Sequence, residues 1–588
     1  MGFLKSPHRV GGPLLCSLPS WRIPARNLPV PGNNDNTNRE IERIAQNVLN
    51  GLHLEFLDCQ VIGRLSKVDP EPRPVPTVLI IMPNRPQPDL WYRAARKICQ
   101  NLRGHGHSGF SVELIEAALL EGIYCFPVEL RHSIFSKWQG LVEEIVRRSD
   151  TREWTGLDCW RYGTNVDRKA NPVTVIIRVT ASAKGPFTTA ARFVHGILAS
   201  FDEADVDVLF QKDDKRRFVE DPTLYSESAT GQVYPGMSIG IHGSEAGSST
   251  LGSFVQLRFK GENHWSTYGL TCFHCVWPPE NHREDPKMQT PEASKALDRW
   301  VNRPLSMRDN PSLCEMAKKI LRVDHPSPGD LSNTIDYYKS RMRRIRSPEF
   351  WEYKTQIERG GDGWSPDSAK RRYEAWCKAY QHHQETCAPF SQMLRNASYY
   401  FGHVVAGSGM NRTRANKNKL RVGLDWALIK VNQNRIHRQM QGDLVVGSKA
   451  FHYDTRSFIS GFSYDGEIGE RLFKPGMELS KSGRSTKFTT AVYNGLRSAE
   501  ITRLASKRGT GSMVEICWST KVAPKNKEFA ERGDSGSWIF DPDQGSVLGM
   551  LTGGNVGQDT TYVCLTEDIF DDIKDITGAI DVRIAPSP

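Results

Sequence analysis

The chain has 588 residues, of which 38% are hydrophobic and 24% are charged, and its formal net charge at pH 7 is +10. This length predicts roughly two to four domains, each with enough residues to bury a hydrophobic core. No stretch approaches the ~18 consecutive apolar residues of a transmembrane helix, so no membrane span is expected. The 12 cysteines are scattered, which excludes a small disulfide-stapled scaffold; with no secretory leader, they predict an intracellular, cytoplasmic setting.

Residues 1–34 contain no acidic side chain, but they contain six prolines together with Lys5, Arg9, Arg22 and Arg26. A transit peptide is also basic, but it must form an amphipathic helix, which this density of proline opposes. The segment is therefore predicted to be a disordered basic tail.

Residues 35–210 contain a weak internal repeat. The aligned pairs are Thr77–Ile81 with Thr174–Ile177, Ala94–Arg96 with Ala190–Arg192, and Phe110–Leu114 with Val206–Phe210. Each copy is expected to form a strand, a helix and a second strand, which predicts an α/β or α+β domain with an internal duplication. Because the domain contains no catalytic cluster, it is interpreted as a binding or regulatory module that contacts a protein partner. A linker is expected over 211–234, where charged and small polar residues dominate.

The segment 280–397 interrupts the β-rich remainder of the chain. Its apolar residues recur at helical spacing among many charges, as in Pro291–Val301, which predicts an inserted helical subdomain. Two basic clusters accompany this insertion: Lys339–Arg346 lies within it and Arg412–Arg421 follows it. Such clusters can follow a phosphate backbone, but charged helical faces are more often simply solvated. A nucleic-acid partner is therefore not expected.

Three short segments carry the residues needed for acyl transfer. Ser535 lies in a Gly-Asp-Ser-Gly turn before an apolar run, where its hydroxyl can sit beside free backbone N–H groups. A serine hydroxyl is a weak nucleophile and needs a base and a carboxylate. His274 ends a β-rich run, and Asp425 enters another apolar strand. The chain order His274, Asp425, Ser535 is one of the three known orders of a Ser-His-Asp triad.

These segments resemble the trypsin/chymotrypsin-like serine peptidases, in particular intracellular, fungal-type members. The similar pieces are LTCFHCV around His274, LDWALI around Asp425, GDSGS around Ser535, ELSKSGRSTKFTTAVYNG at 478–495 and GSVLGMLTGGN at 545–555. The resemblance implies an all-β chymotrypsin-like double barrel with a helical insertion, in a multidomain chain. The expected organisation is a tail at 1–34, a duplicated domain at 35–210, a linker at 211–234, a protease domain at 235–279 and 398–575, a helical insertion at 280–397, and a tail at 576–588.

The resemblance also implies a role for each site residue. Ser535 would attack the acyl carbon, His274 would take its proton and return it to the leaving amine, and Asp425 would orient the imidazole. The N–H groups of Gly533 and Ser535 would form the oxyanion hole. Substrate-binding positions are expected at the pocket base and on the strand after the nucleophile, namely Phe529, Ala530, Thr552, Gly553 and Gly554. The substrate would be a protein or peptide, with no cofactor.

The sequence departs from secreted trypsins at two points. Cys275 has no cysteine in the region where its usual disulfide partner would lie, and an activation sequence that would release a new amine is absent. The partner of Asp534 is therefore open: local hydrogen bonds, a basic side chain such as Arg484, or an amine freed by a cleavage, which would make the enzyme latent. The Cys272–Cys275 pair is half of a zinc motif, with His383 and Cys387 as a distant second half. No metal is expected, because the triad uses His274.

Two alternatives to a serine endopeptidase remain. One is a catalytically silent protease-like scaffold that keeps the triad by descent. The other is a basic, nucleic-acid-associated protein with an incidental protease fold.

Overall fold

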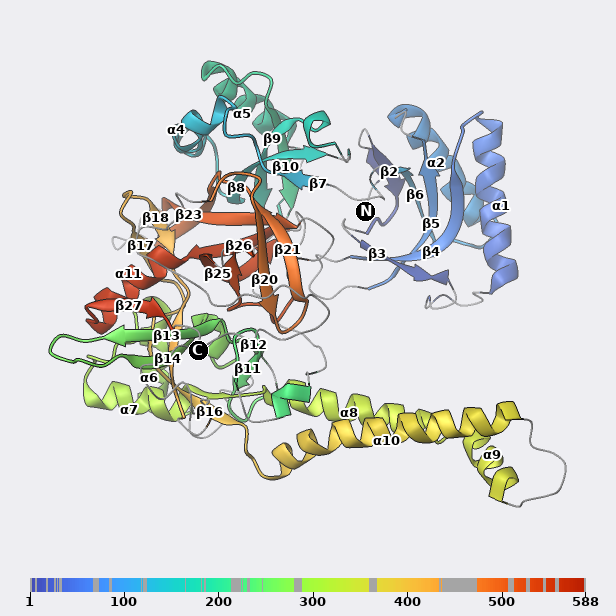
Figure 1. The fold of residues 1–588 in the computed structure, drawn as a ribbon. Helices are drawn as coiled ribbons and strands as arrows, with labels where there is room; N and C mark the ends of the chain where they lie inside the picture. Colours follow the sequence, from blue (N-terminus) through green and yellow to red (C-terminus); the bar gives the residue numbers. More distant parts are fainter. Residues whose placement is uncertain are drawn as a thin grey trace. The chain divides into compact units, whose positions relative to one another are not determined.

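A computed structural model of the chain divides it into two compact units, residues 1–215 with 555–560, and residues 216–554 with 561–588. The boundary falls inside the segment expected to be a linker. The structure describes residues 3–5, 8–16, 20–25, 28, 30, 34–66, 73–83, 87–117, 119, 124–163, 165, 167–180, 182–183, 187–212, 224, 226–229, 233–245, 247–279, 288–358, 367–432, 435, 473–505, 512–524, 529–542, 546–555 and 560–585. Within these residues the protein is multidomain and rich in β-sheet, as expected (Figure 1).

The first unit opens with a six-stranded sheet in the order β1-β2-β6-β5-β4-β3. Its elements are β1 (Leu4–Lys5), β2 (Arg9–Gly12), β3 (Ser20–Pro24), α1 (Asp35–Gly51), β4 (Asp58–Ser66), β5 (Val75–Met82), α2 (Pro88–Gly104) and β6 (Ser111–Glu116). Strands β5 and β6 are parallel, with Thr77 opposite Ser111, and the helix α2 connects them. The apolar faces of α1 and α2 contribute to one buried core with the sheet.

The second half of this unit repeats the arrangement of the first. Its elements are β7 (Tyr124–Phe126), α4 (Ile134–Arg148), β8 (Trp154–Gly163), β9 (Val173–Val179), α5 (Thr188–Ser200) and β10 (Asp207–Lys212). Strands β9 and β10 are parallel, with Thr174 opposite Asp207, while β7–β8 and β8–β9 are antiparallel. The segments aligned in the sequence repeat therefore form matching β-α-β units with the same strand directions.

The structure corrects the expectation of a disordered tail at 1–34. Strand β2 pairs with β6, and Arg9 on β2 donates a 2.7 Å hydrogen bond to the buried carboxylate of Glu113. Arg64 donates to the same carboxylate at 3.1 Å. The basic residues of this segment thus include a partner for a buried acid, which composition alone did not reveal. The expected tail at 576–588 also contains a strand, β27 (Asp581–Ile584), which pairs with β13 (Ser253–Arg258).

The second unit contains an eight-stranded sheet whose neighbouring strands, within the described residues, pair antiparallel. In sheet order its strands are β12 (Ser248–Thr250), β11 (Ser238–Ile241), β15 (Arg322–Asp324), β16 (Tyr400–Gly407), β19 (Ala427–Val431), β14 (Ser266–Thr271), β13 and β27. The neighbouring strands β14 and β19 pair with Thr271 opposite Ala427. This register places the residues just after β14 beside those just before β19.

The same unit contains six further strands whose pairings close into a ring (Figure 1, orange and red). Around the ring they are β20 (Glu478–Gly483), β21 (Lys487–Tyr493), β23 (Ser512–Pro524), β26 (Thr560–Leu565), β25 (Val547–Asn555) and β24 (Trp538–Phe540). Every strand contributes at least one side chain to a single buried cluster, for example Leu479, Val522 and Leu551. Strand β22 (Ser498–Ala505) extends the pairing beyond the ring by its contact with β23.

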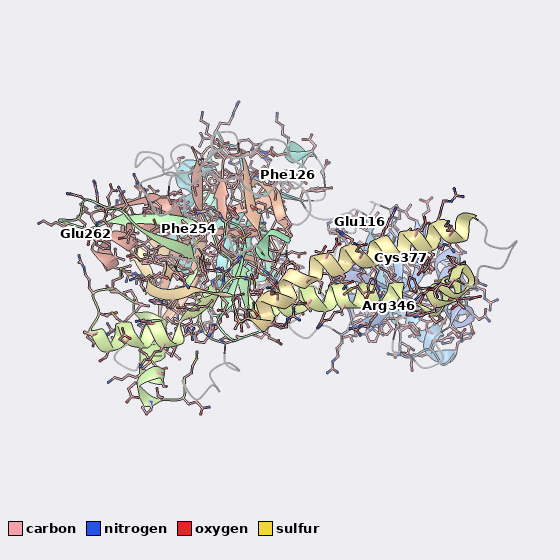
Figure 2. The ribbon with its side chains drawn as sticks, turned by 60° about the horizontal axis from the view of Figure 1, so that its bottom comes forward. Glu116, Phe126, Phe254, Glu262, Arg346 and Cys377 are labelled. Atoms are coloured by element: carbon pink, nitrogen blue, oxygen red, sulfur yellow. The ribbon has the colours of Figure 1, made fainter. Side chains whose placement is uncertain are left out.

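Helices fill most of the described part of 280–397. They are α6 (Pro291–Asn302), α7 (Pro311–Ile320), α8 (Pro328–Ile345), α9 (Pro348–Glu358) and α10 (Asp367–Arg395). Figure 2 shows α10 running beside α8, and side chains such as Leu331, Ile335 and Phe390 form a shared buried cluster. The segment is not purely helical, because β15 lies within it and joins the eight-stranded sheet. Among the described residues, no helix is both long and apolar enough to cross a membrane.

Candidate active site

His274 and Asp425 meet because they lie at adjoining ends of two paired strands. His274 follows β14 in a 3₁₀ turn, and Asp425 lies two residues before β19. Nδ1 of His274 is 2.6 Å from Oδ2 of Asp425. The backbone N–H of His274 donates to Oδ1 of the same carboxylate at 3.1 Å. Both oxygens of Asp425 therefore hold one residue, its ring and its backbone, in a single orientation.

A tight turn carries Ser535; residues 531–537 are called the nucleophile turn below. Gly533 and Gly536 adopt φ of +95° and +97°, a conformation that side-chain-bearing residues rarely adopt. A Cβ on Gly536 would also lie 2.2 Å from the carbonyl oxygen of Thr250. Thr250 anchors the turn through its N–H to the Ser535 carbonyl at 3.0 Å and its Oγ1 to the Gly533 carbonyl at 2.8 Å.

The N–H groups of Gly533 and Ser535 point to no acceptor among the described residues, whereas those of Asp534, Gly536 and Ser537 are bonded. Free N–H groups on either side of Asp534 are the arrangement that an oxyanion hole needs. The pair of donors expected from the sequence is thus available in the turn.

The hydroxyl of Ser535 is fully buried and has no hydrogen-bond partner among the described residues. Nε2 of His274 faces the sulfur of Cys275 instead, at 3.7 Å. The same sulfur lies 3.5 Å from the carbonyl oxygen of Ser535. The structure therefore joins His274 to Asp425 and brings Cys275 against both His274 and Ser535, but it does not form the hydrogen bond between Ser535 and His274.

The histidine and its neighbouring thiol have shifted pKa values. Burial by itself lowers the pKa of His274, but the charges of Cys275 and Asp425 outweigh burial and raise it to about 10. Burial by itself raises the pKa of Cys275, but hydrogen bonding from Cys272 and the nearby imidazole lower it overall. The protonated imidazole is thus stabilised from both of its nitrogen atoms, chiefly by negative charge.

Asp534 has several partners, which answers the question that the sequence left open. Its carboxylate lies 3.2 Å from the ammonium of Lys481, and both side chains are fully buried. It also accepts from the N–H of Ser485 at 2.8 Å and from Oγ1 of Thr486 at 2.7 Å. Arg484, one of the partners considered from the sequence, instead donates its Nε to Asp330 at 2.7 Å.

The substrate-binding positions expected from the sequence lie close to the nucleophile turn. Phe529 is buried in the core of the ring, and its carbonyl oxygen accepts from Oγ1 of Thr489 at 2.6 Å. Ala530 packs against that core while remaining partly exposed. Thr552, Gly553 and Gly554 are buried positions of β25. The preceding residue on this strand, Leu551, exchanges hydrogen bonds with the turn, both at 2.8 Å, to the carbonyl of Ser537 and from the N–H of Gly536.

Sequence reasoning missed three contributors to this region: Lys481, Thr250 and the close approach of Cys275. Lys481 left one signal in the sequence: it alternates with Leu479 and Gly483 along a strand, so it shares the face of a small and an apolar residue. In the structure all three are buried. A lysine at such a position needs a buried anion. Thr250 left none, because its contacts join segments almost three hundred residues apart, as its bond to Gly533 shows.

Donor atoms of Cys272, His274 and Cys275 lie within 4.8 Å of one another and could hold a metal ion. Among the described residues, neither His383 nor Cys387 joins this group, so the second half of the zinc motif considered from the sequence is elsewhere. The ring of His274 is already bound to Asp425, and the sulfur of Cys272 contacts the carbonyl of Leu551 at 3.2 Å. In the structure, the His274 ring and the Cys272 sulfur thus contact other protein atoms.

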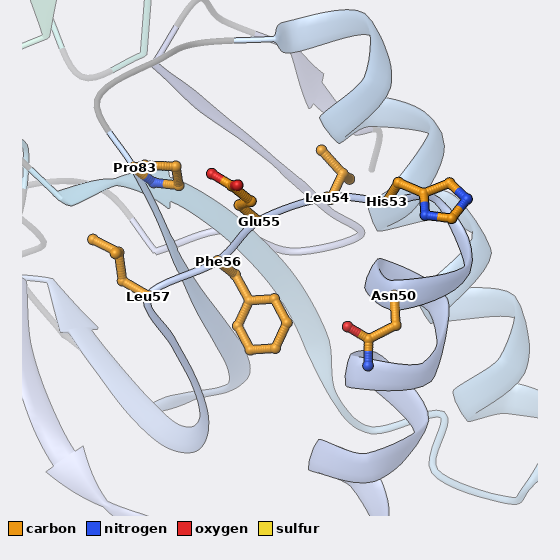
Figure 3. Close-up of a pocket in the computed structure, with 7 residues that line it drawn as sticks. All are labelled: Asn50, His53, Leu54, Glu55, Phe56, Leu57 and Pro83. Atoms are coloured by element: carbon orange, nitrogen blue, oxygen red, sulfur yellow. The ribbon is translucent and has the colours of Figure 1, made fainter.

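A separate pocket of about 620 Å³ lies in the first unit (Figure 3). It is lined by Asn50, His53, Leu54, Glu55, Phe56, Leu57 and Pro83. Figure 3 shows Asn50 at the end of α1 and the other residues along the connection to β4 and beside β5. None of the residues expected to carry acyl transfer lines this pocket.

Comparison with known proteins identifies one related family. The family model of peptidase family S64, a serine peptidase family with a trypsin-like fold, matches residues 337–581. The match covers fewer than half of the 588 residues, contains Asp425 and Ser535, and begins after His274. It confirms the resemblance to serine peptidases that the sequence motifs carry, and it supports a peptidase acting on protein substrates. No curated protein matches the chain.

Proposed function

We propose, from the similarity of residues 337–581 to peptidase family S64, that this chain is a serine endopeptidase with a His274–Asp425–Ser535 triad. The observation that carries the proposal is the 2.6 Å contact between His274 and Asp425, next to a Gly-Asp-Ser-Gly turn in which two N–H groups have no acceptor in the described part of the chain. The eight-stranded sheet and the six-stranded ring would be the two barrels of a chymotrypsin-like fold. Their pairings and the shared core of the ring support this assignment.

The proposed reaction follows from the positions of the charges. Ser535 attacks the carbonyl carbon of a peptide bond, and His274 accepts the serine proton at Nε2. Asp425 stabilises the imidazolium through Nδ1 and the backbone N–H. The negative oxygen that forms on the substrate accepts from the N–H groups of Gly533 and Ser535. His274 then returns the proton to the leaving amine, and water releases the acyl group from Ser535.

One movement is required before the first step. Nε2 of His274 must turn from the sulfur of Cys275 toward the hydroxyl of Ser535. Catalytic hydrogen bonds are often long or misaligned before substrate binds, and they shorten in the substrate complex. The sulfur of Cys275 lies 3.5 Å from the Ser535 carbonyl oxygen. Because the two segments already touch, a local movement is sufficient.

The second basic cluster, Arg412–Arg421, gives little support to a nucleic-acid role. Four of its cations already face acids: Arg412 with Asp572, Arg414 with Asp575, Lys417 with Asp571 and Arg421 with Glu515. In the first cluster, the guanidinium carbon of Arg346 lies 4.3 Å from the ring centre of Tyr380. Cations engaged in this way are less free to neutralise phosphates.

The direct test is covalent labelling of the purified full chain by a fluorophosphonate probe, which reacts with activated serines. Wild type is expected to be labelled, whereas Ser535→Ala and His274→Ala are not. Labelling at a residue other than Ser535 would contradict the proposed nucleophile. Absence of labelling, together with wild-type folding by circular dichroism, would favour the silent scaffold.

The labelling rate is expected to rise with pH, because His274 must lose its proton before it can act as a base. Its pKa is raised to about 10 from an ordinary value near 6.5, so the neutral imidazole appears only as pH rises through the alkaline range. Removing one cause with Cys275→Ala is expected to move the midpoint toward neutral pH. The measurement is the fluorophosphonate labelling rate between pH 5 and 11 for both proteins. If the labelling rate of wild type reaches its pH midpoint at or below about 6.5, the ordinary pKa of histidine, the prediction of a raised pKa for His274 is contradicted.

A further inference from the structure

Lys481 is a buried cation for which the acid–base chemistry above has no use. It lies on β20 with no exposed side-chain surface, and its ammonium is 3.2 Å from Oδ2 of Asp534. It also donates to Oγ1 of Thr486 at 2.6 Å and to the carbonyl of Lys487 at 3.3 Å. An ammonium without water must be paired with an anion to remain charged, and Asp534 supplies that charge.

Asp534 is also held by groups of the β20–β21 hairpin and by one group of its own turn. The N–H groups of Ser485 and Glu531 donate to its two oxygens at 2.8 Å and 3.0 Å. Lys481 is the ion-pair partner that the described part of the chain gives Asp534. The absence of a Cβ on Gly483 makes this approach possible, since a Cβ there would lie 2.4 Å from Oδ1 of Asp534.

The position of Asp534 in the chain gives the ion pair a consequence for the site. Its neighbours are Gly533 and Ser535, whose N–H groups are the free donors of the proposed oxyanion hole. A side chain held at both oxygens fixes the backbone on either side of it. The orientation of both donors therefore depends in part on an anchor that lies on β20, outside the nucleophile turn.

We propose that Lys481 is a positioning residue, whose ammonium holds Asp534 so that the oxyanion-hole donors are formed in the uncleaved chain. In the sequence, no activation site was found that could release an amine for Asp534. Lys481 supplies the positive charge from within the chain. This inference rests on the proposed function for its effect on catalysis, but the positioning itself is testable without activity.

The test is hydrogen–deuterium exchange of the full chain, read on peptides covering 529–540. The amides of Asp534, Gly536 and Ser537 are hydrogen-bonded in the turn and should be protected in wild type. In Lys481→Met we expect their exchange to accelerate at least about tenfold, while peptides from β14 and β19 keep wild-type rates. Lys487→Met is the matched control, because it removes a neighbouring lysine of the same hairpin that donates to the carbonyl of Arg484. The control is expected to leave the turn protected.

The second readout is the labelling rate measured as a function of fluorophosphonate concentration. It gives two quantities: the maximal labelling rate at saturating probe, and the probe concentration at half of that maximal rate. Lys481→Met is expected to lower the saturating rate about 10²–10³-fold, the typical effect of losing an oxyanion donor, with little change in half-saturation. Lys481→Arg is expected to restore part of the rate, because it keeps the charge. If Lys481→Met does not fold, the double variant Lys481→Met/Asp534→Asn avoids a buried unpaired charge and is tested in its place.

The outcomes separate the two proposals. If the folded Lys481→Met variant exchanges its turn amides at the same rate as wild type, the positioning role is overturned, whatever the activity. Faster exchange with an unreactive wild type would retain the positioning role and refute the proposed peptidase. Faster exchange with an unchanged labelling rate would overturn the link between the ion pair and the oxyanion hole.

Discussion

Ser535→Ala is expected to lower kcat for hydrolysis of labelled casein by about 10⁶-fold, the usual cost of removing the nucleophile of a working triad. The variant removes one oxygen to which none of the described residues is hydrogen-bonded. Ser535 helps to hold the turn through its backbone carbonyl, which contacts the N–H of Thr250 and the sulfur of Cys275. Both contacts remain in the alanine variant. The fold should therefore keep its thermal midpoint within about 2 °C, because no buried partner is lost.

Ser537→Ala is the matched control for this loss. Ser537 is a buried serine in the same turn, and its hydroxyl donates to the Asp534 carbonyl at 2.6 Å. Losing that bond should cost about 1 kcal/mol of stability while changing kcat by only a few-fold. Equal losses of activity in the two alanine variants would mean that the turn needs its packing and that Ser535 is not the nucleophile.

Asp425→Asn is expected to lower kcat by about 10⁴-fold while leaving the protein folded. The amide has the shape of the carboxylate, and its oxygen can still accept from the N–H of His274, as Oδ1 does at 3.1 Å. Its nitrogen, however, donates toward Nδ1, where the carboxylate accepts at 2.6 Å. The ring is then held with its proton on Nε2, so it cannot accept the proton of Ser535. The measurement is kcat for casein hydrolysis, with the folded state checked by circular dichroism.

A double variant tests whether Asp425 acts through the histidine. Residues that act as a unit give losses that do not multiply. His274→Ala combined with Asp425→Asn should therefore be no less active than His274→Ala alone. A further loss from the second substitution would show that Asp425 contributes to catalysis independently of His274.

The residues that we propose for the site could be proposed from the sequence because each lies in a short local context. Ser535 lies in a turn where two positions have a positive φ, which favours glycine. Asp425 precedes a mostly apolar strand. The repeat in the first unit was also readable, since Thr77 and Thr174 begin equivalent pairings with the following strand. Patterns of this kind depend on neighbouring residues, which the chain keeps close together before it folds.

Composition misled wherever a residue is stabilised by a distant partner. The segment 1–34 is basic and rich in proline, yet Arg9 is held on a strand by Glu113. In the helical segment, Arg322–Asp324 is too short to be recognised as a strand, but β11 and β16 pair with it on both edges. These partners lie many residues away in the chain, so no local pattern contains them.

The sequence by itself determined which chemistry we propose for this protein: it contains a serine, a histidine and an aspartate in a known triad order, and the glycines that permit a sharp turn. Only the tertiary structure decided what surrounds them. Asp534 is paired with Lys481 and not with Arg484, which is bound to Asp330. Nε2 of His274 faces Cys275. The physical reason is that a buried charge takes the partner that folding brings within hydrogen-bonding distance, and the arrangement of strands sets that distance.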